Sequence, residues 1–120
     1  KNEIVMNGAK VLTFAMDVVP NNVKALLKRI KISTNKIDKF IFHQASKYIL
    51  DNINRRLSLN KEKTFENYGK VGNTISASIP IALKDAYTKK KIFNNNKIVI
   101  AGYGVGLSWG SALLRWNKIL

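Results

Sequence analysis

Three short stretches of the sequence contain residues whose types and positions could support chemistry. The first is Phe42-His43-Gln44-Ala45, which holds the single histidine of the chain at the end of a short β-branched and aromatic run. In α/β folds, ligands and catalytic groups gather at the ends of such strands, and imidazole is a common acid, base or hydrogen-bonding group. An imidazole with a purely structural role is the alternative interpretation.

The second stretch runs from Gly69 to Thr74 and contains Asn73. As a functional group, the Asn73 amide would donate an N–H to a carbonyl oxygen. Its side-chain oxygen could instead cap the helix that we expect to begin there. The glycines before Asn73 would permit a close approach of the backbone in either case.

The third stretch contains four glycines between two expected strands, Gly102, Gly104, Gly106 and Gly110. Glycine-rich loops that bind phosphate normally lead into a helix, whereas a strand is expected after these glycines. A nucleotide-binding loop is therefore not favoured. A backbone N–H directed at a developing oxyanion is compatible with this stretch, and so is a simple turn that connects two strands.

Hydrophobic spacing predicts the elements that must position these residues. The expected helices cover Val11–Ile30, a stretch from about Ser46 to Leu57, and Asn73–Lys89, and the expected strands cover Lys39–His43, Lys97–Ala101 and Ser111–Trp116. Pro20 should kink the first helix or divide it into two abutting helices. Pro80 should make the first turn of the last helix irregular.

The order of these elements predicts an α/β fold with a mixed sheet flanked by helices. Strands separated by helices usually run parallel, and the short link between the last two strands favours an antiparallel hairpin. Ile4-Val5-Met6 is typical of the end of a strand whose partners lie earlier. We therefore expect the chain to be a piece of a longer protein.

Composition excludes several kinds of site. The 120 residues include no cysteine, which rules out disulfides, thiolate metal sites and a cysteine nucleophile within them. We expect no metal site, and we expect no membrane association because no apolar run approaches the length of a membrane span. A cytoplasmic location is the corresponding expectation.

The charge of the chain is strongly positive, with 21 Lys and Arg against 7 Asp and Glu and a net charge of +14. Such an excess is compatible with an acidic partner. The lysines are spread along the sequence, however, and no arginine-rich stripe with interleaved aromatic residues is present. We therefore expect no nucleic acid partner and interpret most of these lysines as a solvated surface.

The three stretches occur in an order that resembles the C-terminal half of a β-ketoacyl-acyl carrier protein synthase III, a thiolase-like condensing enzyme. The motifs that carry the resemblance are Met6-Asn7-Gly8, His43-Gln44-Ala45, Gly72-Asn73-Thr74, Ser76-Ala77-Ser78-Ile79-Pro80 and the segment from Gly104 to Ala112. The resemblance implies a thiolase-like half over residues 1–120. It also implies that an N-terminal half of similar fold completes the active site.

In that family a Cys, a His and an Asn form the active site, and the matching residues here are His43 and Asn73. The Cys belongs to the N-terminal half, so we expect these 120 residues alone to be inactive. By the same motifs, the backbone N–H of Val105 would face the acyl-thioester oxygen. Gly8, Ser46 and Gly104 match positions beside the substrate.

The resemblance further implies the substrates. An acyl group from acyl-CoA would be carried by the Cys, and malonyl-acyl carrier protein would lose carbon dioxide to give an enolate that attacks it. No cofactor is implied beyond the coenzyme A thioester itself, and the full-length protein is expected to be a homodimer. Tyr48 stands where well-known members carry a carrier-docking Arg, and Lys47, Arg55 and Arg56 on the same helix could replace it.

Two alternatives remain open from the sequence. Departures from the common family pattern at Tyr48, Val105 and Leu107 are compatible with a related thiolase-like synthase of a secondary or surface-sugar pathway. The positive charge and the missing cysteine are compatible with a non-catalytic basic binding module.

Overall fold

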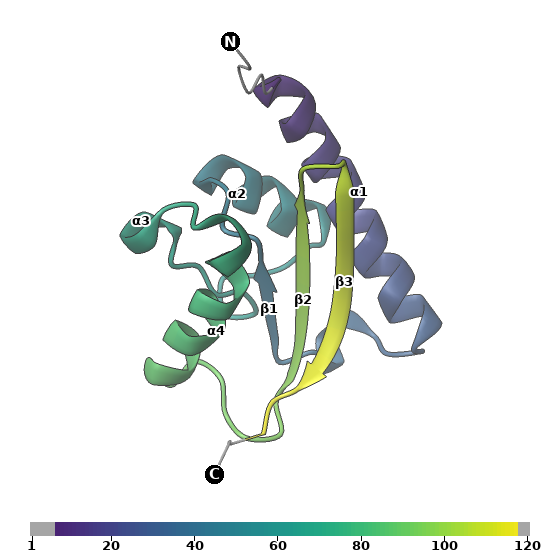
Figure 1. The fold of residues 1–120 in the computed structure, drawn as a ribbon. Helices are drawn as coiled ribbons and strands as arrows, with labels where there is room; N and C mark the ends of the chain where they lie inside the picture. The colour runs from purple at the N-terminus through teal and green to yellow at the C-terminus, as the bar shows by residue number, and fades with distance from the viewer. Residues whose placement is uncertain (1–6, 118–120) are drawn as a thin grey trace.

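The computed structural model describes residues 7–117 and arranges them as helices on both faces of a small sheet (Figure 1). The helices are α1 (Gly8–Arg29), α2 (Lys47–Arg56), α3 (Tyr68–Val71) and α4 (Ser78–Thr88), and the strands are β1 (Lys39–Phe42), β2 (Lys97–Gly104) and β3 (Ser108–Arg115). Short 3-10 turns lie at Thr34–Lys36 and Ile75–Ala77.

The sheet has the strand order β1-β2-β3. β1 runs parallel to β2, with Phe40 opposite Val99, and β2 runs antiparallel to β3, with Ala101 opposite Ser111. The predicted mixed sheet is therefore confirmed. Because β1 and β2 are parallel, their carboxyl ends lie at the same end of the sheet, beside the turn between β2 and β3 (Figure 1).

The larger core lies between the sheet and the pair α1 and α2. Ala15, Val19, Val23 and Leu27 recur every fourth residue and form the buried face of α1. They belong to one cluster with Phe40 and Phe42 of β1 and with Ile49, Leu50 and Ile53 of α2. Each large apolar side chain buried in this way contributes about 1.5–3 kcal/mol, so this cluster fixes β1 against α1.

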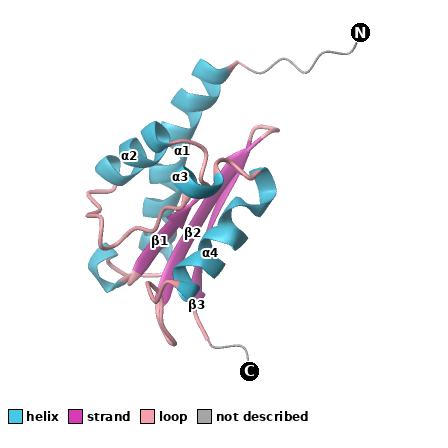
Figure 2. Ribbon diagram, turned by 90° about the vertical axis from the view of Figure 1, so that its left-hand side faces the viewer, coloured by secondary structure: helices cyan, strands magenta, loops and turns pink. Residues whose placement is uncertain are grey.

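The second core lies on the opposite face of the sheet, under α4. Ile41 points there because successive side chains of a strand alternate between faces. It packs with Ile98 of β2 and with Ala82 and Ala86 of α4. Figure 2 shows the resulting three layers, with α1 and α2 on one side of the strands and α4 on the other.

Of the two outcomes predicted at Pro20, a kink or two abutting helices, the second is wrong, because α1 continues through Pro20 as a single helix. A proline inside a helix costs about 3 kcal/mol or more through its lost hydrogen bond and its steric clash. Ala15 and Val19 before Pro20, and Val23 and Leu27 after it, are all buried against the same sheet. Burial on both sides of the proline offsets that cost.

The helix predicted from Asn73 begins later, at Ser78. A 3-10 turn at Ile75–Ala77 precedes α4, in agreement with the predicted irregular start of this helix. Pro80 is the third residue of α4. Amides in the first turn of a helix have no partner within it, so a proline is tolerated there. The predicted capping of this helix by Asn73 is wrong, since the Asn73 side chain bonds to Ile75 before the helix starts.

The glycine-rich connection is shorter than its glycines suggested. Gly102 and Gly104 lie within β2 and Gly110 lies within β3, so residues 105–107 alone form the turn. The pairing of Tyr103 with Trp109 and of Gly104 with Ser108 extends the ladder through these glycines. The predicted strand end at residues 4–6 lies outside the described residues.

Two expected absences concern the described residues alone. Between residues 7 and 117 there is no helix with the length and apolar character needed to cross a membrane. Within the same range no three or more His, Cys, Asp or Glu residues are grouped so that they could hold a metal ion.

Candidate active site

His43 directly follows β1 and continues its pairing with β2, since its N–H donates to the carbonyl oxygen of Ala101 at 2.9 Å. The imidazole is partly buried and lies edge to face against the Tyr103 ring, with 5.2 Å between the ring centroids. Burial lowers the pKa of His43 below its ordinary value of 6.5. The imidazole is therefore neutral at pH 7 and offers one N–H donor and one acceptor.

Tyr103 lies beside His43 but was not among the predicted catalytic or substrate-binding residues. Burial raises its pKa to about 12, so the phenol stays protonated. Its hydroxyl is buried and has no hydrogen-bond partner among residues 7–117. The available signal was strand register: Phe42 is opposite Ala101, so the aromatic residue two positions further along β2 follows beside His43.

Asn73 lies exposed within residues 69–77, which run from inside α3 to the residue before α4 and are here called the Asn73 segment. Its Oδ1 accepts a hydrogen bond from the N–H of Ile75 at 3.0 Å. Because this bond occupies the side-chain oxygen of Asn73, the amide Nδ2 is the group that could donate to another molecule.

Gly72 sets the direction of the backbone within the Asn73 segment. It ends α3 with φ 68° and ψ −162°, a combination that is essentially restricted to glycine. An ordinary residue here would redirect the chain immediately before Asn73.

His43 and Asn73 are connected through Gln44. The Gln44 side chain is fully buried, and its Oε1 accepts from the backbone N–H groups of Asn67 and Tyr68 at the start of α3. The Asn73 segment therefore begins from a point bonded to the residue that follows His43. Figure 1 shows the end of β1 and the connection from α3 to α4 toward the same end of the sheet.

The predicted substrate contacts fall into two groups. Gly104 ends β2, and Ser46 and Val105 follow the carboxyl ends of β1 and β2. Gly8 instead is the first residue of α1, which projects beyond the sheet (Figure 1). Ser46 also has a structural role, because its Oγ accepts from the N–H of Ile49 and caps α2. Val105 is 94% exposed in the turn between β2 and β3, so its backbone is accessible.

The three basic residues predicted for carrier docking all lie on α2, but they differ in their partners. Lys47 pairs with Asp51 of the same helix and has Glu66 within 3.8 Å. Arg56 pairs with Asp17 of α1 at 2.6 Å. Arg55 is exposed and has no ion pair within the described part of the chain. Its charge is therefore the least compensated of the three.

Residues 27–116 match the family model described as 3-oxoacyl-[acyl-carrier-protein (ACP)] synthase III C terminal. The chain belongs to this family. The matched range contains His43, Ser46, Asn73, Gly104 and Val105, whereas Gly8 lies outside it. The order of motifs that suggested a synthase III in the sequence is thus confirmed at the level of the family.

Named relatives of the synthase III family agree with this assignment. The chain is 42% identical over 114 residues to a β-ketoacyl-[acyl-carrier-protein] synthase III of Prochlorococcus marinus (strain MIT 9515), covering 95% of this chain and 34% of the relative. It is 44% identical over 116 residues to one from Porphyra umbilicalis, covering 97% of this chain and 36% of that relative. The chain thus spans about a third of the length of these synthases.

The fold of the chain is that of the same part of solved synthase III structures. The enzyme from Thermus thermophilus superimposes with a TM-score of 0.93 at 34% identity, over 98% of this chain and 36% of that chain. The synthase III from Pseudomonas aeruginosa PAO1 gives a TM-score of 0.92 at 34% identity, over 99% of this chain and 38% of that chain. The predicted thiolase-like half is confirmed.

Proposed function

We propose that this chain is the C-terminal domain, residues 1–120, of a condensing enzyme that joins an acyl group from acyl-CoA to malonyl-acyl carrier protein in fatty acid biosynthesis. The remainder of the protein supplies the nucleophilic Cys. The enzyme works in the cytoplasm as a homodimer and needs no cofactor beyond the coenzyme A thioester of its substrate. The observation that carries this proposal is the neutral His43 imidazole linked through Gln44 to the segment that presents the Asn73 amide.

The proposed chemistry follows from what these two groups can donate. The acyl group is first transferred from sulfur to sulfur, from coenzyme A to the Cys thiolate, with coenzyme A thiol as the leaving group. Loss of carbon dioxide from the malonyl thioester then leaves negative charge on the thioester oxygen of an enolate. His43 and Asn73 each donate one hydrogen bond to that oxygen. Donors fixed before the charge develops contribute on the order of 3 kcal/mol each.

Carbon–carbon bond formation completes the proposed reaction. The enolate carbon attacks the acyl carbonyl on the Cys, and the Val105 N–H supports the oxygen that becomes negative. Collapse of this intermediate expels the Cys thiolate and releases a 3-oxoacyl-carrier protein. A neutral imidazole is required at the decarboxylation step, because an N–H donor must be present without a competing proton transfer. Burial of His43 supports this state.

The test uses the full-length synthase that contains this chain. We expect His43→Ala and Asn73→Ala each to slow the decarboxylation of malonyl-carrier protein on the order of 100- to 1,000-fold, since each removes one donor to the enolate oxygen. Release of labelled carbon dioxide measures this step directly. Ser76→Ala, an exposed serine of the Asn73 segment, is the matched control. Decarboxylation at the parental rate in both donor variants would refute the proposal.

A related synthase with another acyl donor or acceptor is the second candidate. The observation that favours it is the exposure of Tyr48, Val105 and Leu107, three positions where the sequence departs from the common family pattern. A panel of acyl-CoA and malonyl thioesters offered to the full-length enzyme separates the two candidates. Exclusive use of acetyl-CoA with malonyl-carrier protein would eliminate the second.

A further inference from the structure

The Gln44 side chain has no exposed surface and uses both its amide nitrogen and its amide oxygen in hydrogen bonds. Its Nε2 donates to the carbonyl oxygen of Phe42 at 2.8 Å. Its Oε1 accepts from the backbone N–H of Asn67 at 3.0 Å and from that of Tyr68 at 3.3 Å. A buried amide must be satisfied in this way, because an unpaired polar group in the interior is costly. The side chain is thus held in one orientation from both ends.

These contacts place the start of the Asn73 segment. The first amides of a helix lack partners within it, and at α3 the residue before the helix does not supply one. Asn67 makes no side-chain bond to α3, because its Nδ2 donates to Asp85 of α4 at 3.0 Å. Gln44 serves as the cap instead, from the end of β1. The start of α3 is therefore hydrogen-bonded directly to the residue that follows His43 in the chain.

The backbone of the same residue places the end of the Asn73 segment. The N–H of Gln44 donates to Ser78 Oγ at 2.6 Å, and Ser78 is the buried first residue of α4. The residues that flank the Asn73 segment are consequently bonded to Gln44, those before it through the Gln44 side chain and Ser78 after it through the Gln44 main chain.

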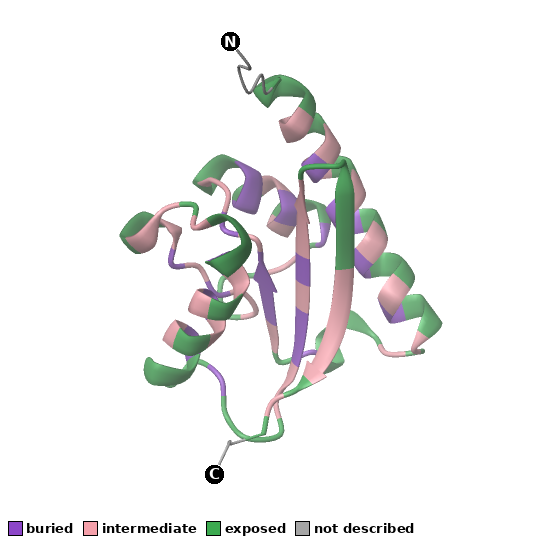
Figure 3. Cartoon of the chain, in the orientation of Figure 1, coloured by how far each residue is buried: buried purple, intermediate pink, exposed green. Residues whose placement is uncertain are grey.

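Between these two anchors the Asn73 segment has few other restraints. None of residues 69–77 is buried, and Figure 3 shows the connection leading into α4 in the colours of exposed and intermediate residues. The described hydrogen bonds of this segment stay within residues 67–78, such as Gly72 N–H to Tyr68, Ala77 N–H to Thr74 and Ser78 N–H to Ile75. The segment makes no described hydrogen bond of its own to the sheet. Gln44 therefore supplies the described hydrogen-bonded link between this segment and the end of β1, beside the packing of α4 on the sheet.

We propose that Gln44 is a positioning residue that sets the distance and orientation of the Asn73 amide relative to the His43 imidazole. This inference rests on the proposed function, in which both groups donate to one enolate oxygen. Gln44 touches no reacting atom itself. It acts on decarboxylation through Asn73, because misplacing a donor by about 1 Å is sufficient to lower a rate on the order of 100-fold.

The deciding experiment is a double-mutant cycle in the full-length synthase. Gln44→Met keeps the length of the side chain and removes both of its polar ends. We expect it to slow malonyl-carrier protein decarboxylation on the order of 100-fold, while acyl transfer from acyl-CoA to the enzyme thiol stays at the parental rate. In an Asn73→Ala background the same substitution should change decarboxylation little, since coupled residues do not act additively. Ser76→Ala again serves as the control.

Ser78→Ala provides a second route to the same test if Gln44→Met does not fold, because it removes only the anchor at the far end of the segment. Equal losses of decarboxylation in the parental and Asn73→Ala backgrounds would show an effect on folding alone and would overturn the inference. So would an unchanged rate in a folded Gln44→Met protein. If instead Asn73→Ala and His43→Ala decarboxylate at the parental rate, the proposed function itself fails, and the inference falls with it.

Discussion

His43 owes its neutral state to burial, the single cause of its lowered pKa. Its nearest aromatic neighbour, Tyr103, is uncharged as well because its own pKa is raised to about 12. A carboxylate beside the imidazole would instead favour the charged form. Any further burial of His43 by the rest of the protein would lower its pKa again. The neutral imidazole would then be favoured more strongly in the full-length protein than in this domain alone.

The pH dependence of stability tests this state of His43. Because the folded pKa lies below the ordinary value of 6.5, the folded protein binds its proton at lower pH than the unfolded chain does. The contribution is therefore fully present above pH 6.5 and is lost as the pH falls from that value toward the folded pKa. We expect the free energy of unfolding of the full-length synthase, from denaturant titrations, to decrease across this window.

The matched variant for this measurement is His43→Gln, which keeps a polar side chain without a titrating group. The free energy of unfolding of this variant should lack the pH-dependent contribution of His43. The free energy of unfolding of the parental protein should therefore fall relative to that of the variant as the pH falls below 6.5. A difference that stays constant across this window would show that His43 has its ordinary pKa.

At the scale of elements, hydrophobic spacing was sufficient for the long helices and for the three strands among residues 7–117. The four-residue repeat from Ala15 to Leu27 and the alternation of Phe40, Ile41 and Phe42 each bury one face in a predictable way. The helix does not divide at Pro20, the second of the two outcomes predicted there, because tertiary burial, which spacing does not measure, overrides the local cost of proline.

The candidate site was predictable only in part, for a related reason. Motif order selected His43 and Asn73. The structure places His43 at the end of β1 and Asn73 in the segment before α4. The one-turn helix α3 and the role of Gln44 were not predictable, because they depend on hydrogen bonds between residues more than twenty positions apart. A single sequence gives no signal for such contacts.

The path of the Asn73 segment gives a prediction at this scale. We expect Gly72→Ala to lower the free energy of unfolding by about 1–3 kcal/mol, because a Cβ strains the backbone at φ 68° and ψ −162°. Decarboxylation should fall with it, since Asn73 follows directly. Denaturant titration and carbon dioxide release in the full-length synthase measure the two effects.

Gly69→Ala is the natural comparison for this change. Gly69 lies inside α3, and an added Cβ there would meet no atom within 4 Å. Alanine at such a position stabilises a protein by about 0.4–1 kcal/mol. Equal effects of the two substitutions would contradict the special conformation of Gly72.

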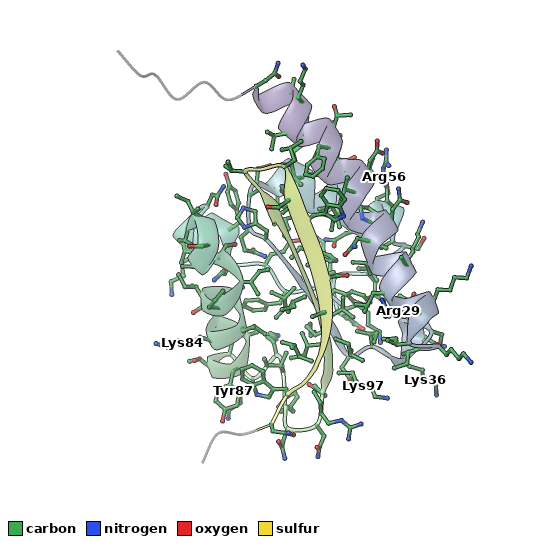
Figure 4. The ribbon with its side chains drawn as sticks, turned by 45° about the vertical axis from the view of Figure 1, so that its right-hand side comes forward. Arg29, Lys36, Arg56, Lys84, Tyr87 and Lys97 are labelled. Atoms are coloured by element: carbon green, nitrogen blue, oxygen red, sulfur yellow. The ribbon has the colours of Figure 1, made fainter. Side chains whose placement is uncertain are left out.

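At the scale of the whole molecule, the net charge of +14 is distributed unevenly with respect to ion pairs. Figure 4 shows Arg56 beside α1, which carries its partner Asp17, and shows Arg29 much further along the same helix. On α2, Lys47 and Arg56 are compensated by acidic neighbours, and Arg55 is not. An acidic carrier protein would therefore gain most from Arg55.

We expect Arg55→Glu in the full-length synthase to raise KM for malonyl-carrier protein about two- to fivefold, the range of exposed charge interactions. The increase should shrink at high salt, where surface charges are screened. Steady-state kinetics at two ionic strengths measure it. Arg29→Glu makes the same charge change at the far end of α1 and should leave KM unaltered; an equal rise in both variants would indicate a general effect of net charge.

The strand order also has a consequence for how the chain acquires its structure during synthesis. β2 meets β3 across a turn of three residues, 105–107, but meets β1 only after α2, α3 and α4 have been made. Loop closure over such a distance is slow compared with formation of a hairpin. As the ribosome releases the polypeptide, β1 with its two phenylalanines emerges long before its partner strand exists. Its other edge can bond to residues 63–65 soon afterwards, but the edge that pairs with β2 stays open for longer. Such an open apolar edge is prone to aggregation until α1 or a chaperone covers it.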